Sequence, residues 1–210
     1  MRFRFVLTIL AVSLFGSPTT AVEGHDCYGQ DNKRRIEGCS RLIEQPGLAI
    51  DQLAEAYAMR ALAYSLLGRY ESAINDYNEA INLIPDYAIA LNNRAWAYFK
   101  WGRPTTGLPD VQRSLQLDAT SAHAFDTRAH IYQWLGQKEQ AIQDYDAAMR
   151  FGGSRMIRLY QCGLQAQRFY SGPTDGIMSP ELTKAIRACV NEQSKCDPLP
   201  PDEECKIPTS

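Results

Sequence analysis

The chain has 210 residues, of which 45% are hydrophobic and 22% are charged. These proportions are ordinary for a folded protein of one or two domains, and they exclude a largely disordered chain. With 22 basic and 24 acidic residues the formal net charge is -2, which gives no electrostatic reason to bind nucleic acid or an anionic membrane. We therefore expect neither partner.

The first 21 residues have the composition of a secretory signal peptide. Arg2 and Arg4 make a basic start, residues 5–16 are apolar, and small residues follow up to Ala21. The apolar run is shorter than the roughly 20 residues that a membrane-spanning helix needs. The sequence therefore predicts cleavage after Ala21 and a periplasmic or secreted protein of a bacterium that does not span the membrane.

Six cysteines lie in the predicted mature chain, and an even number in an exported protein favours disulfides. No Cys-x-x-Cys pair or nearby histidine gives the spacing of a metal site, so we expect no metal and no cofactor. The preferred first pair joins Cys27 to Cys39 across a loop of about a dozen residues. The cysteines are Cys27, Cys39, Cys162, Cys189, Cys196 and Cys205.

A 34-residue unit occurs three times, over residues 54–87, 88–121 and 122–155. Seven columns are identical in all copies, including a glycine midway through each unit at Gly68, Gly102 and Gly136. In the first copy, apolar and small residues recur at helical spacing over 53–67 and again over 71–83. Each copy is therefore predicted to form two helices joined by a turn at its glycine.

This repeat resembles the tetratricopeptide (TPR) repeat, in which helix-turn-helix units stack into a right-handed superhelix. The resemblance implies an all-α fold with three TPR repeats. An amphipathic helix over residues 31–45, within a capping segment 22–53, is expected to cover the first repeat.

An arginine and an aspartate recur 16 residues apart in every repeat. In an antiparallel helix pair this spacing brings the two side chains together, so we predict three structural ion pairs. They are Arg60 with Asp76, Arg94 with Asp110, and Arg128 with Asp144. The second copy differs by carrying Pro104, Gly107 and Pro109, and its second helix is expected to start late or to be kinked.

The TPR resemblance also implies that the first helix of each repeat faces a concave surface. Outward positions there form a mixed aromatic and polar patch, a composition typical of protein contacts. The alternative is that Trp96 and Trp134 are buried between helices. His123 and His130 lie two turns apart, too far to share a metal, and are interpreted as surface or groove polar groups. The predicted partner-binding groove is Ile89, Asn92, Asn93, Trp96, Phe99, Lys100, His123, Asp126, His130, Gln133 and Trp134.

After residue 155 the repeat period is lost, and residues 156–193 resemble the small helical peptidoglycan-binding domain of bacterial cell-wall proteins. The resemblance rests on a helical pattern over 156–167, a turn motif and a capped helix starting at Pro180. Its ligand-side positions are Tyr170, Gly172, Pro173, Asp175 and Gly176. A disulfide from Cys162 to Cys189 is expected to replace packing in this module. A Cys196–Cys205 disulfide is expected to hold the proline-rich tail, residues 194–210.

These features predict a non-catalytic exported adaptor, with a protein or peptide in the TPR groove and peptidoglycan as an expected second partner. One alternative is a cell-wall hydrolase or its accessory protein, although no catalytic constellation is visible in the sequence. The other is that the C-terminal module is only a structural cap of the repeat array.

Overall fold

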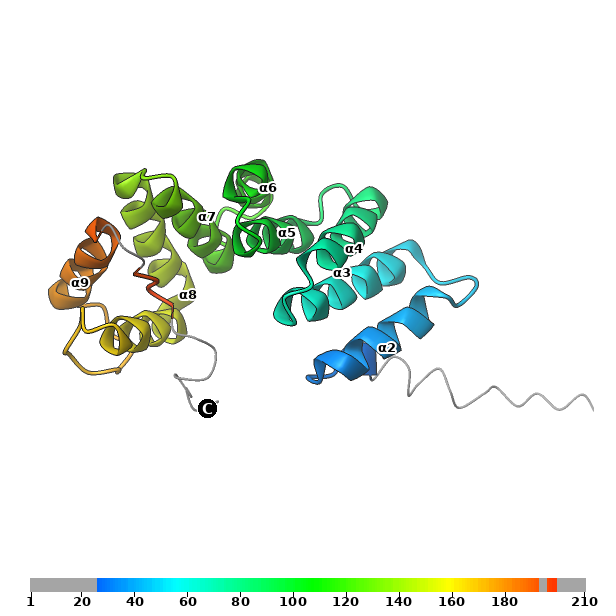
Figure 1. Ribbon diagram of the computed structural model, residues 1–210, viewed down its shortest axis with the longest axis horizontal. Helices are drawn as coiled ribbons and strands as arrows, with labels where there is room; N and C mark the ends of the chain where they lie inside the picture. The colour runs from blue at the N-terminus through cyan, green and yellow to red at the C-terminus, as the bar shows by residue number, and fades with distance from the viewer. Residues whose placement is uncertain (1–25, 193–195, 200–210) are drawn as a thin grey trace, which may run out of the picture.

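A computed structural model describes residues 26–192 and 196–199, so the predicted signal peptide and its cleavage site lie outside the described residues. The described residues form helices without any strand. Figure 1 shows that the helices follow one another in an arch, with α2 near one end and α9 at the other. They are α2 (Asn32–Ile43), α3 (Ile50–Leu66), α4 (Tyr70–Leu83), α5 (Ala88–Lys100), α6 (Pro104–Leu117), α7 (Ala122–Trp134), α8 (Lys138–Ala166) and α9 (Pro180–Asn191).

The N-terminal cap forms as predicted. Asp31 caps α2 by accepting a hydrogen bond from the Arg34 main-chain N–H. Cys27 and Cys39 form a disulfide, and both are fully buried. Leu42 joins them against Ala56 of α3, so the cap covers the end of the first repeat and the predicted pairing is confirmed.

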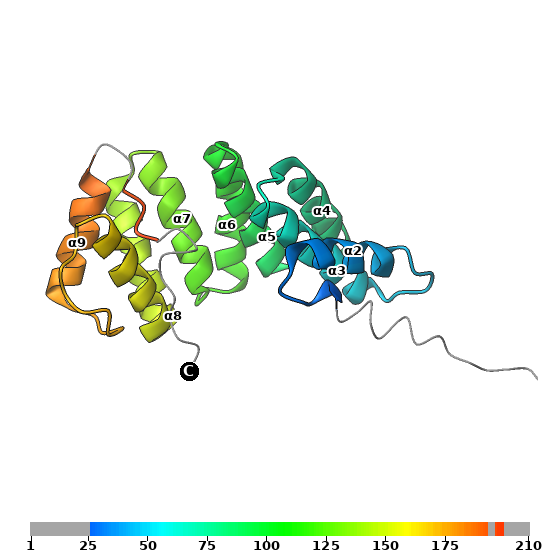
Figure 2. The ribbon, with the colours of Figure 1, turned by 60° about the horizontal axis from the view of Figure 1, so that its bottom comes forward.

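The three repeats are built from buried alanines and from a glycine at each turn. Helix pairs α3–α4, α5–α6 and α7–α8 pack against each other, and small side chains let their backbones approach closely. Gly68, Gly102 and Gly136 have φ angles of 72°, 76° and 74°, which only glycine adopts without strain. The first helices of the repeats, α3, α5 and α7, contact one another along the array (Figure 2).

All three predicted ion pairs are present. The Arg Nε to Asp Oδ2 distance is 2.7 Å in the pairs Arg60–Asp76, Arg94–Asp110 and Arg128–Asp144. In each pair a second guanidinium nitrogen donates to the other carboxylate oxygen, which makes the contact bidentate. Since one partner lies on each helix of a repeat, the pairs fix how the two helices meet.

Helix α6 does not start late, so that prediction was wrong. It begins at Pro104, the position equivalent to the start of α4, and runs continuously to Leu117. Pro104 is tolerated because the first N–H groups of a helix have no partner within it. Pro109 is exposed, as is Thr105 four residues earlier. Water can therefore reach the Thr105 carbonyl that Pro109 leaves without an N–H donor.

Replacing Gly107 by alanine is expected to destabilise the protein by about 1–3 kcal/mol. A Cβ at this position would lie 2.7 Å from the main-chain oxygen of Ala95, so α6 would have to move away from α5. The better helix propensity of alanine, worth about 1 kcal/mol, works against this loss. Urea unfolding followed by circular dichroism checks it, with exposed Thr106→Ala on the same helix as the control. An unchanged midpoint for Gly107→Ala would contradict it.

The C-terminal segment shares its core with the third repeat. Helix α8 contains the second helix of that repeat and the predicted helix 156–167, joined through a kink at Gly153. Residues of the third repeat, such as Tyr145, belong to the same buried cluster as Tyr160 of α8 and Leu182 and Ile186 of α9. No break in the core therefore marks the boundary predicted at residue 155.

Two predicted disulfides were wrong. Cys189 at the end of α9 pairs with Cys196, seven residues further on. Cys162 therefore cannot pair with Cys189, nor Cys196 with Cys205. Cys162 is disulfide-bonded, and Cys205 lies outside the described residues. The pair forms because the chain after α9 brings Cys196 back to the end of that helix. Helical periodicity in the sequence does not predict this path.

Candidate binding pocket at the third repeat

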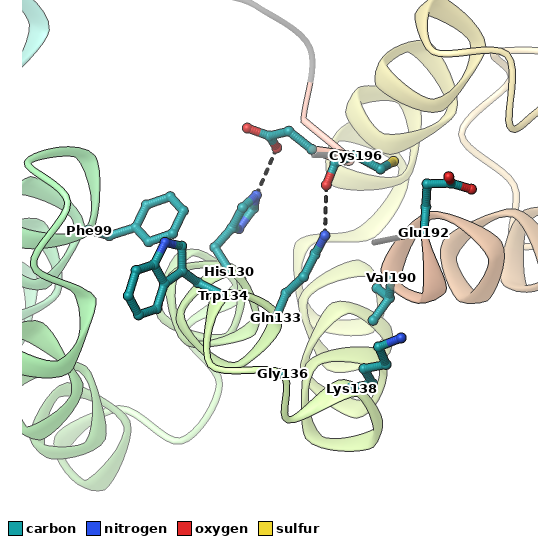
Figure 3. A pocket seen from close by; sticks show the side chains of 10 residues that line it. Phe99, His130, Gln133, Trp134, Gly136, Lys138, Val190, Glu192 and Cys196 are labelled. Carbon is teal, nitrogen blue, oxygen red and sulfur yellow. Dashed lines mark hydrogen bonds and ion pairs between the residues drawn. The ribbon is translucent and has the colours of Figure 1, made fainter. Parts of the chain in front are cut away.

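A pocket of about 490 Å³ lies where α5, α7, the start of α8, the end of α9 and the segment Cys196–Leu199 meet. We call this segment the C-terminal strap. Figure 3 shows Phe99 and Trp134 on one side of the pocket and Val190 and Glu192 on the other, with Lys138 nearby. The pocket thus combines apolar walls with charges of both signs.

The apolar wall is a group of stacked rings. Trp96 stacks on Phe99 with ring centroids 5.2 Å apart, and both rings meet the edge of the His130 imidazole. The Lys100 ammonium lies over the Trp96 ring, a favourable cation–π contact. Trp134 remains 61% exposed. Such a side chain offers a partner a large apolar surface at low entropic cost.

The polar floor is centred on buried His130. Its Nδ1 lies 2.8 Å from the main-chain oxygen of Asp126, and its Nε2 lies 2.9 Å from Asp197 Oδ1. The Tyr160 hydroxyl donates to Asp126 Oδ1, and the Tyr145 ring packs edge-on against the imidazole. Two carboxylates, one on α7 and one on the strap, therefore flank a single imidazole.

This arrangement changes the protonation of His130. Burial alone lowers the pKa of His130, but the carboxylates of Asp126 and Asp197 outweigh it and raise the pKa from 6.5 to about 9. Burial alone raises the pKa of Asp197, but its hydrogen bond to His130 outweighs this and lowers the pKa. At neutral pH the pair is an imidazolium and a carboxylate.

The strap is held over α7 and α8 by side-chain amides. Gln133 Nε2 donates to the Cys196 carbonyl over 2.7 Å. The Gln167 amide contacts both main-chain groups of Asp197, accepting from its N–H at 3.0 Å and donating to its carbonyl. Figure 3 shows the contacts of His130 and Gln133 with the strap side by side. The strap is thus fixed by its backbone as well as by its carboxylate.

The structure brings five of the predicted groove residues together, and four others do not line the pocket. Trp96, Phe99, His130, Gln133 and Trp134 meet at the pocket and its aromatic wall. Exposed residues are Ile89, Lys100 and His123, and Asn93 is half-buried.

Three predicted groove residues are buried, so their outward placement was wrong. These residues are Asn92, Asp126 and His130. Asn92 Nδ2 donates to Asn93 Oδ1, and the other two lie beneath α8 and the strap. Helical position alone placed them on the concave surface, but the C-terminal segment covers the part of that surface that α7 contributes.

Sequence reasoning missed the residues that the C-terminal segment contributes to the pocket. They are Lys138, Val190, Glu192, Cys196 and Asp197. No repeat column or spacing pointed to them, because they meet α7 only through the tertiary fold. The one available signal was the even cysteine count, which indicated that the tail is tied back to the domain.

The residues singled out by the peptidoglycan-binding resemblance mainly serve the fold. Asp175 Oδ1 accepts from Gln161 Nε2 at 2.8 Å and from the Ile177 N–H at 2.9 Å. Gln161 is fully buried and also accepts from the Gly176 N–H. Tyr170 is buried, with its hydroxyl donating to the Pro173 carbonyl, and the Gln165 amide donates to the Gly172 carbonyl. These side chains organise the loop before α9.

Neither metal ligands nor a membrane span are found within the described part of the chain. No three His, Cys, Asp or Glu side chains in it are grouped so as to hold a metal ion. No described helix is long and apolar enough to cross a bilayer.

The fold defines a helical repeat protein built from helix-turn-helix units. Consistent with this class, residues 61–102 match a TPR repeat family model and residues 122–151 match a tetratricopeptide repeat model. Residues 61–102 and 122–151 thus carry TPR repeats. TPR repeats are typically non-catalytic and suggest a scaffold for protein–protein interaction.

Two solved structures share the fold. A crystal structure of MamA is 19% identical over 58% of this chain and 68% of that chain, with a TM-score of 0.50. A MamA RS-1 ArsTM double mutant is 16% identical over 74% of this chain and 83% of that chain, with a TM-score of 0.53. At these identities the likeness concerns the fold alone. No curated protein matches the sequence.

Proposed function

We propose that this protein is an exported, non-catalytic scaffold that binds a segment of another protein in the pocket at the third repeat. The exposure of Trp134, 61%, at the rim of this pocket carries the proposal. Phe99 and Val190 supply further apolar surface, and Lys138 and Glu192 supply charges at its edge. Exposed aromatic residues next to apolar and charged side chains are enriched where proteins contact one another.

A photo-crosslinking amino acid at Trp134 is expected to capture a partner in cells of the source organism. The matched control carries the same amino acid at Phe151, an exposed aromatic residue of α8 that does not line the pocket. Mass spectrometry identifies the crosslinked protein. Crosslinks that appear equally at both positions, or at neither, would contradict a partner site at Trp134.

We propose that the C-terminal module caps the repeat array. Its support is the shared core, in which α9 buries Leu182 and Ile186 beside Tyr160 of α8. The expected second function, docking on peptidoglycan, has no comparable support, since Asp175 and Tyr170 are used internally. Sedimentation of the mature protein with insoluble peptidoglycan tests this, and retention in the pellet would favour the docking function.

The proposed location outside the cytoplasm rests on the N-terminal sequence and the cysteines. The Cys27–Cys39 and Cys189–Cys196 disulfides suit an oxidising compartment. Fractionation of cells with N-terminal sequencing tests the proposal, with a mature chain beginning at Val22 expected in the periplasm or medium. An uncleaved cytoplasmic protein would overturn it.

A further inference from the structure

We propose that the C-terminal strap occupies part of the partner-binding surface as an internal ligand. A partner would then bind at the same place through a segment of the same chemistry: an acidic residue, then proline, then an aliphatic residue. The inference rests on the proposed function, because the strap and the pocket share His130 and Gln133.

The protein contacts the strap in the way that receptors contact peptides. Gln133 and Gln167 hold the main-chain groups of Cys196 and Asp197 with their side-chain amides. Among the described residues, no main-chain hydrogen bond joins the strap to a helix. Helix side chains therefore hold the Cys196 carbonyl and both main-chain groups of Asp197, and the same donors and acceptors could hold the backbone of another chain.

The side chains of the strap define which sequence fits. Asp197 Oδ1 lies 2.9 Å from His130 Nε2, so this position selects a carboxylate. Pro198 is fully buried, and Leu199 packs against the core cluster formed by α8 and α9. A proline adds specificity at little ordering cost, because its φ angle is already fixed.

The strap is tethered beside an open pocket. The Cys189–Cys196 disulfide keeps it close to α7, which gives it a high effective concentration against any free peptide. The pocket walls at Phe99 and Trp134 remain accessible next to it. A partner segment can thus first engage the aromatic wall and then replace the strap on His130.

The test uses a fluorescent peptide with the sequence of residues 194–201, carrying serine in place of the cysteine. Its binding to the full mature chain is measured by anisotropy. Asp197→Ala, which weakens the strap but leaves its receptor residues intact, is expected to bind the peptide at least ten times more tightly than the unmodified protein. A peptide with asparagine in place of its aspartate is expected to lose at least tenfold in affinity.

A second variant guards against a misfolded Asp197→Ala protein. The double change Cys189→Ala and Cys196→Ala removes the disulfide that ties the strap to α9 without altering His130 or Gln133, and Glu181→Ala, an exposed acidic residue of α9, is the control. Circular dichroism establishes which variants are folded. Binding that is absent from every folded strap variant, or equal in them and in the unmodified protein, would overturn the inference.

The two proposals fail in different ways. If the peptide does not bind but the crosslink at Trp134 persists, only the internal-ligand inference is rejected. If the peptide binds but Trp134 captures no partner, the surface recognises this chemistry and the proposed partner function fails.

Discussion

Asp144→Ala is expected to destabilise the protein by about 3 kcal/mol, more than any exposed substitution. The carboxylate is buried, and it receives two hydrogen bonds from Arg128, from Nε at 2.7 Å and from Nη2 at 2.8 Å. Its removal leaves a largely buried guanidinium without its anion. The rings of Phe125 and Tyr132, 5.5 and 5.6 Å from the guanidinium carbon, offset part of that loss.

The matched control is Asp146→Ala on the same helix. Its pair with Arg150 is also short, at 2.6 Å, but both side chains are well exposed. An exposed pair contributes at most about 1 kcal/mol, so this variant should change little. Urea unfolding measures both. Equal losses for the two variants would show that burial does not decide the strength of these pairs.

The double variant Arg128→Met with Asp144→Leu distinguishes two causes of the lost stability. One is the loss of the contact itself, and the other is the unpaired charge that Arg128 would leave in Asp144→Ala. We expect it to be more stable than Asp144→Ala alone, because no unpaired charge remains and the new side chains are apolar. A double variant as unstable as Asp144→Ala would indicate that the pair contributes mainly through its geometry.

The repeat array could be predicted from the sequence because the same residues recur at the same positions in all three repeats. The shared Arg and Asp columns predicted the ion pairs, and the glycine columns predicted the turns with positive φ at Gly68, Gly102 and Gly136. The N-terminal cap was also predictable, since the Cys27–Cys39 loop is local and Asp31 is a standard helix cap. These are short-range features.

Only part of the candidate site could be predicted, because its other residues come from the C-terminal segment, whose position depends on the tertiary fold. Phe99, His130, Gln133 and Trp134 follow from the helix face of a TPR repeat. The strap and its contact with His130 join residues 67 positions apart in the chain. For the same reason the Cys189–Cys196 disulfide was missed, and Asp126 was placed on the surface although Tyr160 covers it.

The two prolines of α6 show a second limit of prediction from sequence. Helix-breaking rules describe an isolated helix, whereas α6 is held between α5 and α7. Buried Val111 and Leu115 anchor it to the core, and Pro109 points to the exposed side. The stabilising contacts of the neighbouring repeats therefore outweigh the one hydrogen bond that proline removes.

Raising the pH from 6.5 to 9.5 is expected to reduce the free energy of unfolding by about 3 kcal/mol through His130. The pKa of His130 is about 9 in the folded protein and 6.5 as the ordinary value. The folded state therefore binds more protons than the unfolded state between these values. Its advantage is complete below pH 6.5 and is lost as the pH rises through about 9.

Two carboxyl groups face His130, and burial raises the pKa of the Asp126 carboxyl although His130 and the Tyr160 hydroxyl oppose that shift. Asp126 lies on the same helix and Asp197 on the strap, and both stabilise the imidazolium. Tyr145 and Tyr160 of α8 stay neutral over this range, because burial, foremost, raises the pKa of each hydroxyl well above 10.0. Loss of the proton from His130 therefore removes the positive charge between two carboxylates, and the strap should loosen before the repeats unfold.

Unfolding curves at a series of pH values test the effect, with His130→Gln as the variant and His123→Gln as the control. Glutamine at position 130 keeps a hydrogen-bonding side chain but does not titrate, so its stability should be nearly flat from pH 6.5 to 9.5. Exposed His123 lies on the same helix and should leave the slope unchanged. If His130→Gln keeps the full slope of the unmodified protein, the pH dependence arises from another group, and the ion pair between α7 and the strap does not control it.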